Sequence, residues 1–307
     1  MTPDTPHADF GPVRVYFGEK TGKYPDGNQV VVHGRDTHAV FDTPLVANRI
    51  GDDFDSADLV ILGHVHEDHM AGLHRVPRAP VHVHEADLQA ARSWEGLARH
   101  YGYTPQVLAD LKTKLEATFN YTPRPDAIGY ADGAVWDLGG VRVRAVHMPG
   151  HTSGHSVLLV EPHGVAFIGD IDLSGFGPYY GDATSDLPQF RRSLARLEEL
   201  PASVWITSHH KGAVTDRAAF LKALRAFAAR IDEREQRLLE MLSAGPRSLE
   251  DLVRERLLYP PEHDDLWVDC AERRSIAQHL DELLARGRIA PEGDGRYRLA
   301  GAAGRAA

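Results

Sequence analysis

Four candidate metal ligands, His64, His66, Asp68 and His69, occur within the stretch Gly63-His64-Val65-His66-Glu67-Asp68-His69. The preceding residues, 57–62, form an apolar run that predicts a buried strand. Because alternate side chains of a strand share one face, His64 and His66 can point the same way. The chain must then turn, which brings Asp68 and His69 to the other side of the same hollow. Zinc and other borderline divalent metals prefer imidazole nitrogen and carboxylate oxygen, so this stretch predicts a metal site.

Three later segments show the same pattern of a strand that ends in a small residue followed by His or Asp. The first runs into Pro149-Gly150-His151-Thr152-Ser153-Gly154-His155, the second ends at Gly169-Asp170, and the third ends at Ser208-His209-His210. Together with His-x-His-x-Asp-His, these motifs resemble the signature of the metallo-β-lactamase-fold hydrolases, in the family's order. The resemblance covers about residues 10–225 and implies an α/β fold, an αββα sandwich.

The resemblance also implies two metal ions per chain. One ion would be bound by His64, His66 and His151, the other by Asp68, His69 and His209, and Asp170 would bridge them. Asp68 and Asp170 are the predicted catalytic residues, since two metals activate a shared hydroxide and Asp68 can accept its proton. The family usually has a small residue before the last ligand, which favours His209 over His210. His155 is expected to support a ligand through a hydrogen bond.

Zinc is the preferred metal, with manganese or iron(II) as alternatives. Flavin-linked di-iron reductases of this fold resemble the pattern, but they have Glu where this chain has His66 and need an attached flavodoxin domain. Persulfide dioxygenases share His-x-His-x-Asp-His but use one iron, and they stay open as a minor alternative. Hydrolysis is therefore preferred over redox chemistry.

Substrate contacts are predicted from position alone. The loop that follows Asp170 contains Tyr179 and Tyr180, and Lys211 and His210 follow the last predicted ligand, so these four are candidates for substrate binding. Residues 86–121 have helical spacing without a strand pattern. We expect them to form a helical insertion between the two halves of the sandwich, as a lid over the metals.

A second, smaller unit is predicted after the catalytic domain of residues 1–230. Residues 231–307 show three helical segments, the first over 231–242, followed by a hairpin signal at Glu292-Gly293-Asp294-Gly295. This order resembles a winged helix. Because every predicted ligand lies upstream of Ile231, we expect the metal site to assemble without this unit. Winged helices fused to this fold also serve as packing or dimerisation units, which is the role favoured here and allows a homodimer.

Composition limits the partners. The chain has 307 residues, 42% of them hydrophobic, a net charge of −10 and one cysteine, Cys270, so no disulfide within the chain is predicted. The acidic balance disfavours nonspecific binding to nucleic acid or anionic membranes. No apolar run approaches the ~20 residues of a membrane span, and residues 1–12 lack the apolar core of a signal peptide. A cytoplasmic protein that acts on a small molecule is expected.

Three functions from different classes are compatible with these patterns. The leading hypothesis is a dinuclear metal hydrolase in which a bridging hydroxide attacks a small acyl substrate: a thioester, lactone, ester or amide. The alternative is a phosphodiesterase or ribonuclease, with the winged helix presenting RNA. It is motivated by six arginines of the second unit, but this unit has 12 arginines against 16 acidic residues. A metal-sensing DNA binder is disfavoured because every expected ligand is present. The six arginines are Arg273, Arg274, Arg286, Arg288, Arg296 and Arg298.

Overall fold

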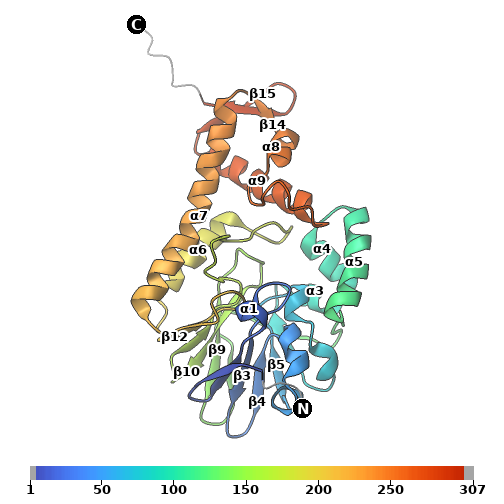
Figure 1. The fold of residues 1–307 in the computed structure, drawn as a ribbon, viewed down its shortest axis with the longest axis vertical. Coiled ribbons are helices and arrows are strands. Elements are labelled where there is room, and N and C mark those ends of the chain that lie inside the picture. The colour runs from blue at the N-terminus through green and yellow to red at the C-terminus, as the bar shows by residue number, and fades with distance from the viewer. Residues whose placement is uncertain (1–4, 301–307) are drawn as a thin grey trace.

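The computed structural model describes residues 5–300, in which two β-sheets form one end of the molecule (Figure 1). The first sheet has seven strands in sequence order. Its strands β1 to β4 pair antiparallel, and β4 to β7 pair parallel. The strands are β1 (His7–Phe10), β2 (Val13–Tyr16), β3 (Gln29–His33), β4 (His38–Phe41), β5 (Leu59–Ile61), β6 (Val81–His84) and β7 (Ile128–Tyr130).

The second sheet has six strands in the order β13-β12-β11-β10-β9-β8. All pairs are antiparallel except β11 with β12, which are parallel. Parallel neighbours end at the same edge, so the residues that follow β11 and β12 lie close together. The strands are β8 (Val135–Asp137), β9 (Arg142–His147), β10 (Ser156–Glu161), β11 (Val165–Phe167), β12 (Val204–Ile206) and β13 (Ala213–Val214).

Apolar side chains that alternate between the two faces of the strands build the sandwich. In β3, Val30 and Val32 belong to the core between the sheets, whereas Val31 faces the helices outside. The outer face of the first sheet is covered by α3 (Leu88–Arg92), α4 (Trp94–Tyr101) and α5 (Pro105–Phe119). The outer face of the second packs on α6 (Leu187–Leu197) and α7 (Arg217–Ser243). These four layers confirm the predicted αββα sandwich.

The helical insertion lies at a different place from the one predicted. Helices α3 to α5 connect β6 to β7, so they belong within the first sheet rather than between the two halves. Within the helical stretch predicted over residues 86–121, α3 and α4 are separated at Ser93, whose side chain accepts a hydrogen bond from the backbone N–H of Gly96 and caps α4. Short segments complete this half: α1 (Glu19–Gly22), α2 (Asp52–Asp55), and 3-10 turns over Leu45–Arg49, Glu67–His69 and Leu73–Arg75.

A single helix connects the sandwich to the C-terminal unit, defined here as residues 231–300 (Figure 1). We predicted a helix starting at Ile231, but α7 begins at Arg217, so the proposed domain boundary falls inside it. The first half of α7 packs into the core on the second sheet. The last helical turns of α7 pack into a separate core of the C-terminal unit. That core also contains α8 (Leu249–Glu255), α9 (Val268–Ala285) and a sheet of β14 (Arg247–Ser248), β16 (Arg296–Leu299) and β15 (Ile289–Glu292). The winged-helix assignment stays a prediction.

The arginines of the C-terminal unit are partly neutralised. Arg273 forms an ion pair with Glu250, and Arg286 forms one with Glu235. Two of the six arginines that motivated the RNA alternative therefore carry their own counter-charge. Within residues 5–300, no helix is both long enough and apolar enough to cross a membrane.

Candidate metal centre

The metal motif occupies the loop that leaves β5 at the centre of the first sheet. The backbone N–H of Gly63 donates a 2.7 Å hydrogen bond to Oδ1 of Asp42, at the end of β4. This bond closes the loop against the neighbouring strand and fixes where the motif starts. A 3-10 turn over Glu67–His69 then reverses the chain, as predicted, so that Asp68 and His69 return to the side of His64. His64, Asp68 and His69 are all buried.

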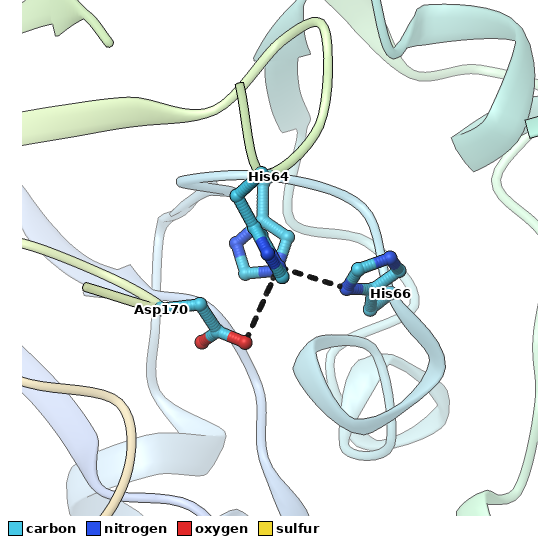
Figure 2. Close-up of side chains that lie close together, drawn as sticks. His64, His66 and Asp170 are labelled. Carbon is cyan, nitrogen blue, oxygen red and sulfur yellow. Dashed lines mark hydrogen bonds and ion pairs between the residues drawn. The ribbon is translucent and has the colours of Figure 1, made fainter. Parts of the chain in front are cut away.

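The first group of predicted ligands consists of His64, His66, His151 and Asp170. One ligand atom of each lies within 4.8 Å of those of the others. Nε2 of His151 lies 3.2 Å from Nδ1 of His66 and 3.3 Å from Oδ2 of Asp170. Figure 2 shows His64 and His66, both from the loop after β5, and Asp170, which approaches them from another segment of the chain. Three imidazoles and a carboxylate oxygen thus surround a space of the size of one metal ion.

The second group consists of Asp68, His69 and His209, whose ligand atoms are equally close together. Nε2 of His209 lies 3.1 Å from Oδ2 of Asp68. The other oxygen of Asp170, Oδ1, lies 3.1 Å from Nε2 of His69 and 3.5 Å from Nε2 of His209. Asp170 therefore directs one oxygen to each group, which is the arrangement that a bridging carboxylate requires.

Several atoms of these groups are buried without a hydrogen-bond partner. They are both ring nitrogens of His64, Nε2 of His69 and Oδ1 of Asp170. An unsatisfied buried polar atom is costly, and a bound cation is one of the few partners that satisfies several at once. Five imidazoles and two carboxylates are also a donor set typical of zinc and similar divalent metals. The residues present fit two metal ions.

Four of the five histidines donate their second ring N–H to an oxygen acceptor. Nε2 of His66 lies 2.7 Å from Oδ2 of Asp182, and Nδ1 of His69 lies 2.7 Å from Oδ2 of Asp42. Nδ1 of His151 lies 3.0 Å from the carbonyl oxygen of Tyr179, and Nδ1 of His209 lies 2.8 Å from that of Gly22. Such partners fix the tautomer, so the lone pair of the other nitrogen points to the metal position.

The charges of the two groups are strongly coupled. Burial alone would lower the pKa of His69, but the carboxylates of Asp68 and Asp170 outweigh it and hold this pKa well above its usual range. The same balance of burial against Asp170 and Asp68 raises the pKa of His209 to about 10. Burial would raise the pKa of Asp170, yet His69 and His209 hold it well below the usual range. The carboxylates therefore attract cations here, and metal binding would displace these protons.

The other predicted residues differ in their distance from these groups. His209 lies in the second group, whereas His210 points to Asp172, with Nε2 3.6 Å from Oδ2, and Lys211 is exposed. Tyr179 is half-buried, and its ring centroid lies 6.4 Å from that of His66. Tyr180 is a correction to the prediction. It is 0% exposed and its hydroxyl lies 2.8 Å from Nε2 of His279, so it packs against α9 and not toward the metals.

His155 supports Asp170 through the backbone. Its Nδ1 donates to the carbonyl oxygen of Met148 at 3.1 Å, and its Nε2 accepts from the backbone N–H of Asp170 at 3.3 Å. Burial, followed by the neighbouring His151, lowers the pKa of His155 to about 3 and keeps the ring neutral for this role. The ligand that His155 supports is therefore Asp170, the residue predicted to bridge the two metals.

Sequence reasoning missed three aspartates that organise the centre. Asp42 and Asp182 hold His69 and His66, as described above. Asp87, which is 1% exposed, accepts hydrogen bonds from Val65, Thr152 and Gly154. It therefore ties the loop of the first motif to the loop that carries His151. Asp42 lies in the Asp-Thr-Pro sequence directly after β4, and nothing in that sequence indicates which histidine it contacts.

The residues that form this centre also match a known family. The family model of the metallo-beta-lactamase superfamily matches residues 25–209, which contain all seven predicted ligands and more than half of the chain. The chain belongs to the metallo-beta-lactamase superfamily. The family assignment made from the sequence motifs is thereby confirmed.

Curated relatives in the superfamily resemble the chain over part of their length. An atrochrysone carboxyl ACP thioesterase of Aspergillus fumigatus is 29% identical over 46% of this chain and 40% of the relative. A second such thioesterase, from Pseudocercospora fijiensis, is 25% identical over 66% of this chain and 57% of the relative. A hydroxyacylglutathione hydrolase of Methylococcus capsulatus is 28% identical over 44% of this chain and 51% of the relative. The chain thus spans about half the length of these relatives.

Solved structures support the fold over nearly the whole chain. A metallo-beta-lactamase family protein from Thermus thermophilus has a TM-score of 0.66 and 25% identity, covering 89% of this chain and 93% of its own. A beta-lactamase domain protein from Burkholderia ambifaria has a TM-score of 0.66 and 19% identity, covering 97% and 95%. The superfamily fold is therefore independently supported.

Proposed function

We propose that the chain is a dinuclear metal-dependent hydrolase that cleaves small acyl substrates, with thioesters as the leading class. The first metal would be held by His64, His66 and His151 and the second by Asp68, His69 and His209. The observation that carries this proposal is the position of Asp170, whose two carboxylate oxygens are directed to different ligand groups. A site for one metal would not require that arrangement. Zinc is the preferred metal, since five of the seven ligands are imidazoles.

Metal ions bound here would supply Lewis acidity and lower the pKa of a water molecule from that of bulk water toward ~7. The residues of the chain supply geometry and proton transfer. The two oxygens of Asp170 set the separation of the two groups. Asp68, with Oδ2 beside His209 and Oδ1 3.6 Å from Nε2 of His69, is placed to accept a proton from the attacking water. Burial of the ligands excludes most bulk water and strengthens these interactions.

The names of the relatives favour a thioester over other acyl compounds. The relatives include proteins named as acyl-carrier-protein thioesterases and one named as an acylglutathione hydrolase. Aromatic rings also lie beside the first group: the ring of Tyr101 stacks on that of His66, with centroids 5.8 Å apart, and Tyr103 stacks on Tyr101. Both tyrosine rings are buried, 4% and 9% exposed, so they pack behind His66 and do not distinguish one acyl compound from another. Tyr179, half-buried beside His66, is the remaining predicted substrate contact.

The test compares acyl substrates with metal-loaded protein. The protein is stripped of metal, loaded with zinc or manganese, and assayed with a thioester, an oxoester, a lactone and an amide that share one acyl group. We expect metal-dependent hydrolysis that is fastest for the thioester. The His66→Ala variant is the matched control, because it should lose a metal and nearly all activity while it keeps the fold. Absence of metal-dependent turnover with all four substrates would refute the proposal.

A further inference from the structure

The loop of residues 174–182, called here the bracing loop, lies between the metal centre and the C-terminal unit. It starts four residues after Asp170. On the metal side it supplies two acceptors: the carbonyl oxygen of Tyr179 for Nδ1 of His151 at 3.0 Å, and Oδ2 of Asp182 for Nε2 of His66 at 2.7 Å. Two of the three histidines of the first group are therefore oriented by this one loop. The second group takes its acceptors from residues outside it, Asp42 and Gly22.

The opposite side of the bracing loop is held by Arg234 of α7. This side chain donates from Nη1 to the carbonyl oxygen of Pro178 at 2.5 Å and from Nη2 to that of Phe176 at 2.6 Å. Its guanidinium carbon lies 5.1 Å from the ring centroid of Phe176 and 5.4 Å from that of Tyr180. Arg234 is only 6% exposed. A buried cation that donates to two carbonyl groups of one loop fixes that loop in place, because unpaired burial of its charge would be costly.

Helix α9 adds a second attachment at the next residue. Nε2 of Gln278 donates to the carbonyl oxygen of Tyr180 at 2.8 Å, while Oε1 of the same amide accepts from the backbone N–H of Leu187 at 2.7 Å. Gly181 packs closely on the same helix, since a Cβ added there would lie 2.7 Å from Cβ of Ala271. The carbonyl of Tyr179 that orients His151 therefore lies between two anchored residues, Pro178 and Tyr180.

We propose that Arg234 is a positioning residue for the first metal group and that the C-terminal unit is thereby part of the metal centre. Release of the loop at Pro178 would move the carbonyl of Tyr179 away from His151, and a shift of about 1 Å is enough to break a 3.0 Å hydrogen bond. Asp182, at the end of the same loop, would move with it. This inference rests on the metal ligands assigned in the proposed function. It also replaces our expectation that the metal site assembles without residues 231–307.

The test compares two substitutions on one helix. Arg234→Gln removes the three bonds of the guanidinium to the bracing loop, those to the carbonyl oxygens of Pro178 and Phe176 and one of 3.2 Å to the hydroxyl of Tyr180. Arg237→Gln removes an arginine from the same helix, one turn further on, where the side chain is exposed. Zinc content is measured in the full-length protein at a series of buffered free zinc concentrations. We expect Arg234→Gln to bind one of its two zinc ions at least about ten-fold more weakly, the effect typical of losing support behind a metal-binding histidine. The other ion in this variant, and both ions in Arg237→Gln, should bind as in the wild type.

Two further variants separate positioning from general damage. His66→Ala removes a ligand of the first group, so the double variant His66→Ala/Arg234→Gln should show no additional loss of zinc. Gln278→Glu replaces the donor to Tyr180 by an acceptor but keeps the oxygen that accepts from Leu187. It should lower the affinity for the same zinc ion, by a smaller factor than Arg234→Gln does. If Arg234→Gln does not fold, the zinc affinities of Gln278→Glu alone test the inference.

Three results would overturn the inference. These are two zinc ions of wild-type affinity in the variants of Arg234 and Gln278, an equal weakening of both ions, or an additional loss in the double variant. If the wild-type protein itself bound fewer than two zinc ions, the metal assignment of the proposed function would be wrong instead, so the two failures are distinguishable.

Discussion

Replacing Asp182 by Asn should cost the protein a metal ion even though this residue is not a predicted ligand. Its Oδ2 accepts from Nε2 of His66 at 2.7 Å, and its Oδ1 accepts from the hydroxyls of Tyr103 at 2.5 Å and Tyr179 at 3.1 Å. Asn has a single carbonyl oxygen. If that oxygen serves the two tyrosines, the amide NH₂ faces Nε2 of His66. His66 must then carry its proton on Nδ1, the nitrogen that lies among the ligands of the first group.

The size of the effect follows from the burial of this pair. Loss of a hydrogen-bond partner behind a metal-binding histidine typically weakens metal binding 10- to 100-fold, which is about 1.4–2.7 kcal/mol. Asp182 is 0% exposed, so water has no access to replace the lost acceptor. We therefore expect the upper end, about 100-fold, for the first metal. The second group has no contact with Asp182 among its orienting bonds, and its affinity should stay within about two-fold of the wild type.

The assay is a zinc titration of metal-free protein against a chromophoric chelator of known affinity. Tyr103→Phe is the control, because it removes a donor to the other carboxylate oxygen and leaves the bond to His66. This control should bind both ions nearly as the wild type does. Two zinc ions of wild-type affinity in Asp182→Asn would refute the tautomer mechanism, and an equal loss in Tyr103→Phe would show that packing alone is responsible.

Three other predictions test separate features. Asp170→Asn keeps the shape but can offer one oxygen only, so zinc content should fall toward one per chain with a large drop in turnover; two tightly bound ions would show that Asp170 does not bridge. Burial, followed by Arg191 and Arg234, lowers the pKa of His279 to about 3, against about 6.5 in the unfolded chain. Protonation of His279 therefore favours unfolding, and its contribution to the free energy of unfolding is complete above about pH 6.5 and falls toward pH 3, by up to about 1.4 kcal/mol per pH unit. Denaturant unfolding at pH 7.5 and pH 5 should show a smaller loss of stability in His279→Gln than in the wild type. Single-stranded RNA incubated with the protein and magnesium, manganese or zinc should remain intact, and salt-sensitive binding with cleavage would revive the nuclease alternative.

The ligands of the centre could be predicted because they are local in sequence. His64, His66, Asp68 and His69 lie within six residues, and each remaining ligand directly follows a strand whose alternation is readable. The parallel pairing of β11 with β12 then brings the ends that carry Asp170 and His209 to one edge of the second sheet. The αββα layers follow for the same reason, since apolar side chains alternate between the two faces of strands such as β3.

The partners behind the ligands could not be predicted. Asp42 lies 27 residues from His69, and Asp182 lies 116 residues from His66. A lone aspartate in a loop carries no sign of which histidine it will meet. The start of α7 was missed because the segment after Arg217 was assigned to the end of the first domain, although its apolar residues continue in register past Ile231. Tyr180 was misjudged because neighbouring aromatics in a loop point to opposite sides, and only Tyr179 faces the metals.

Helix α7 has a consequence for the exchange of parts between related enzymes. Its 27 residues give a rod of ~40 Å that contributes Phe220 and Leu224 to one core and Leu238 and Leu242 to another. A chimera joined at residue 230 would have to preserve the helical phase, because adding or removing a single residue rotates everything beyond the joint by about 100°. Length variation between relatives should therefore be tolerated in the loops around this helix. Insertions within the helix should be confined to lengths that restore the helical phase.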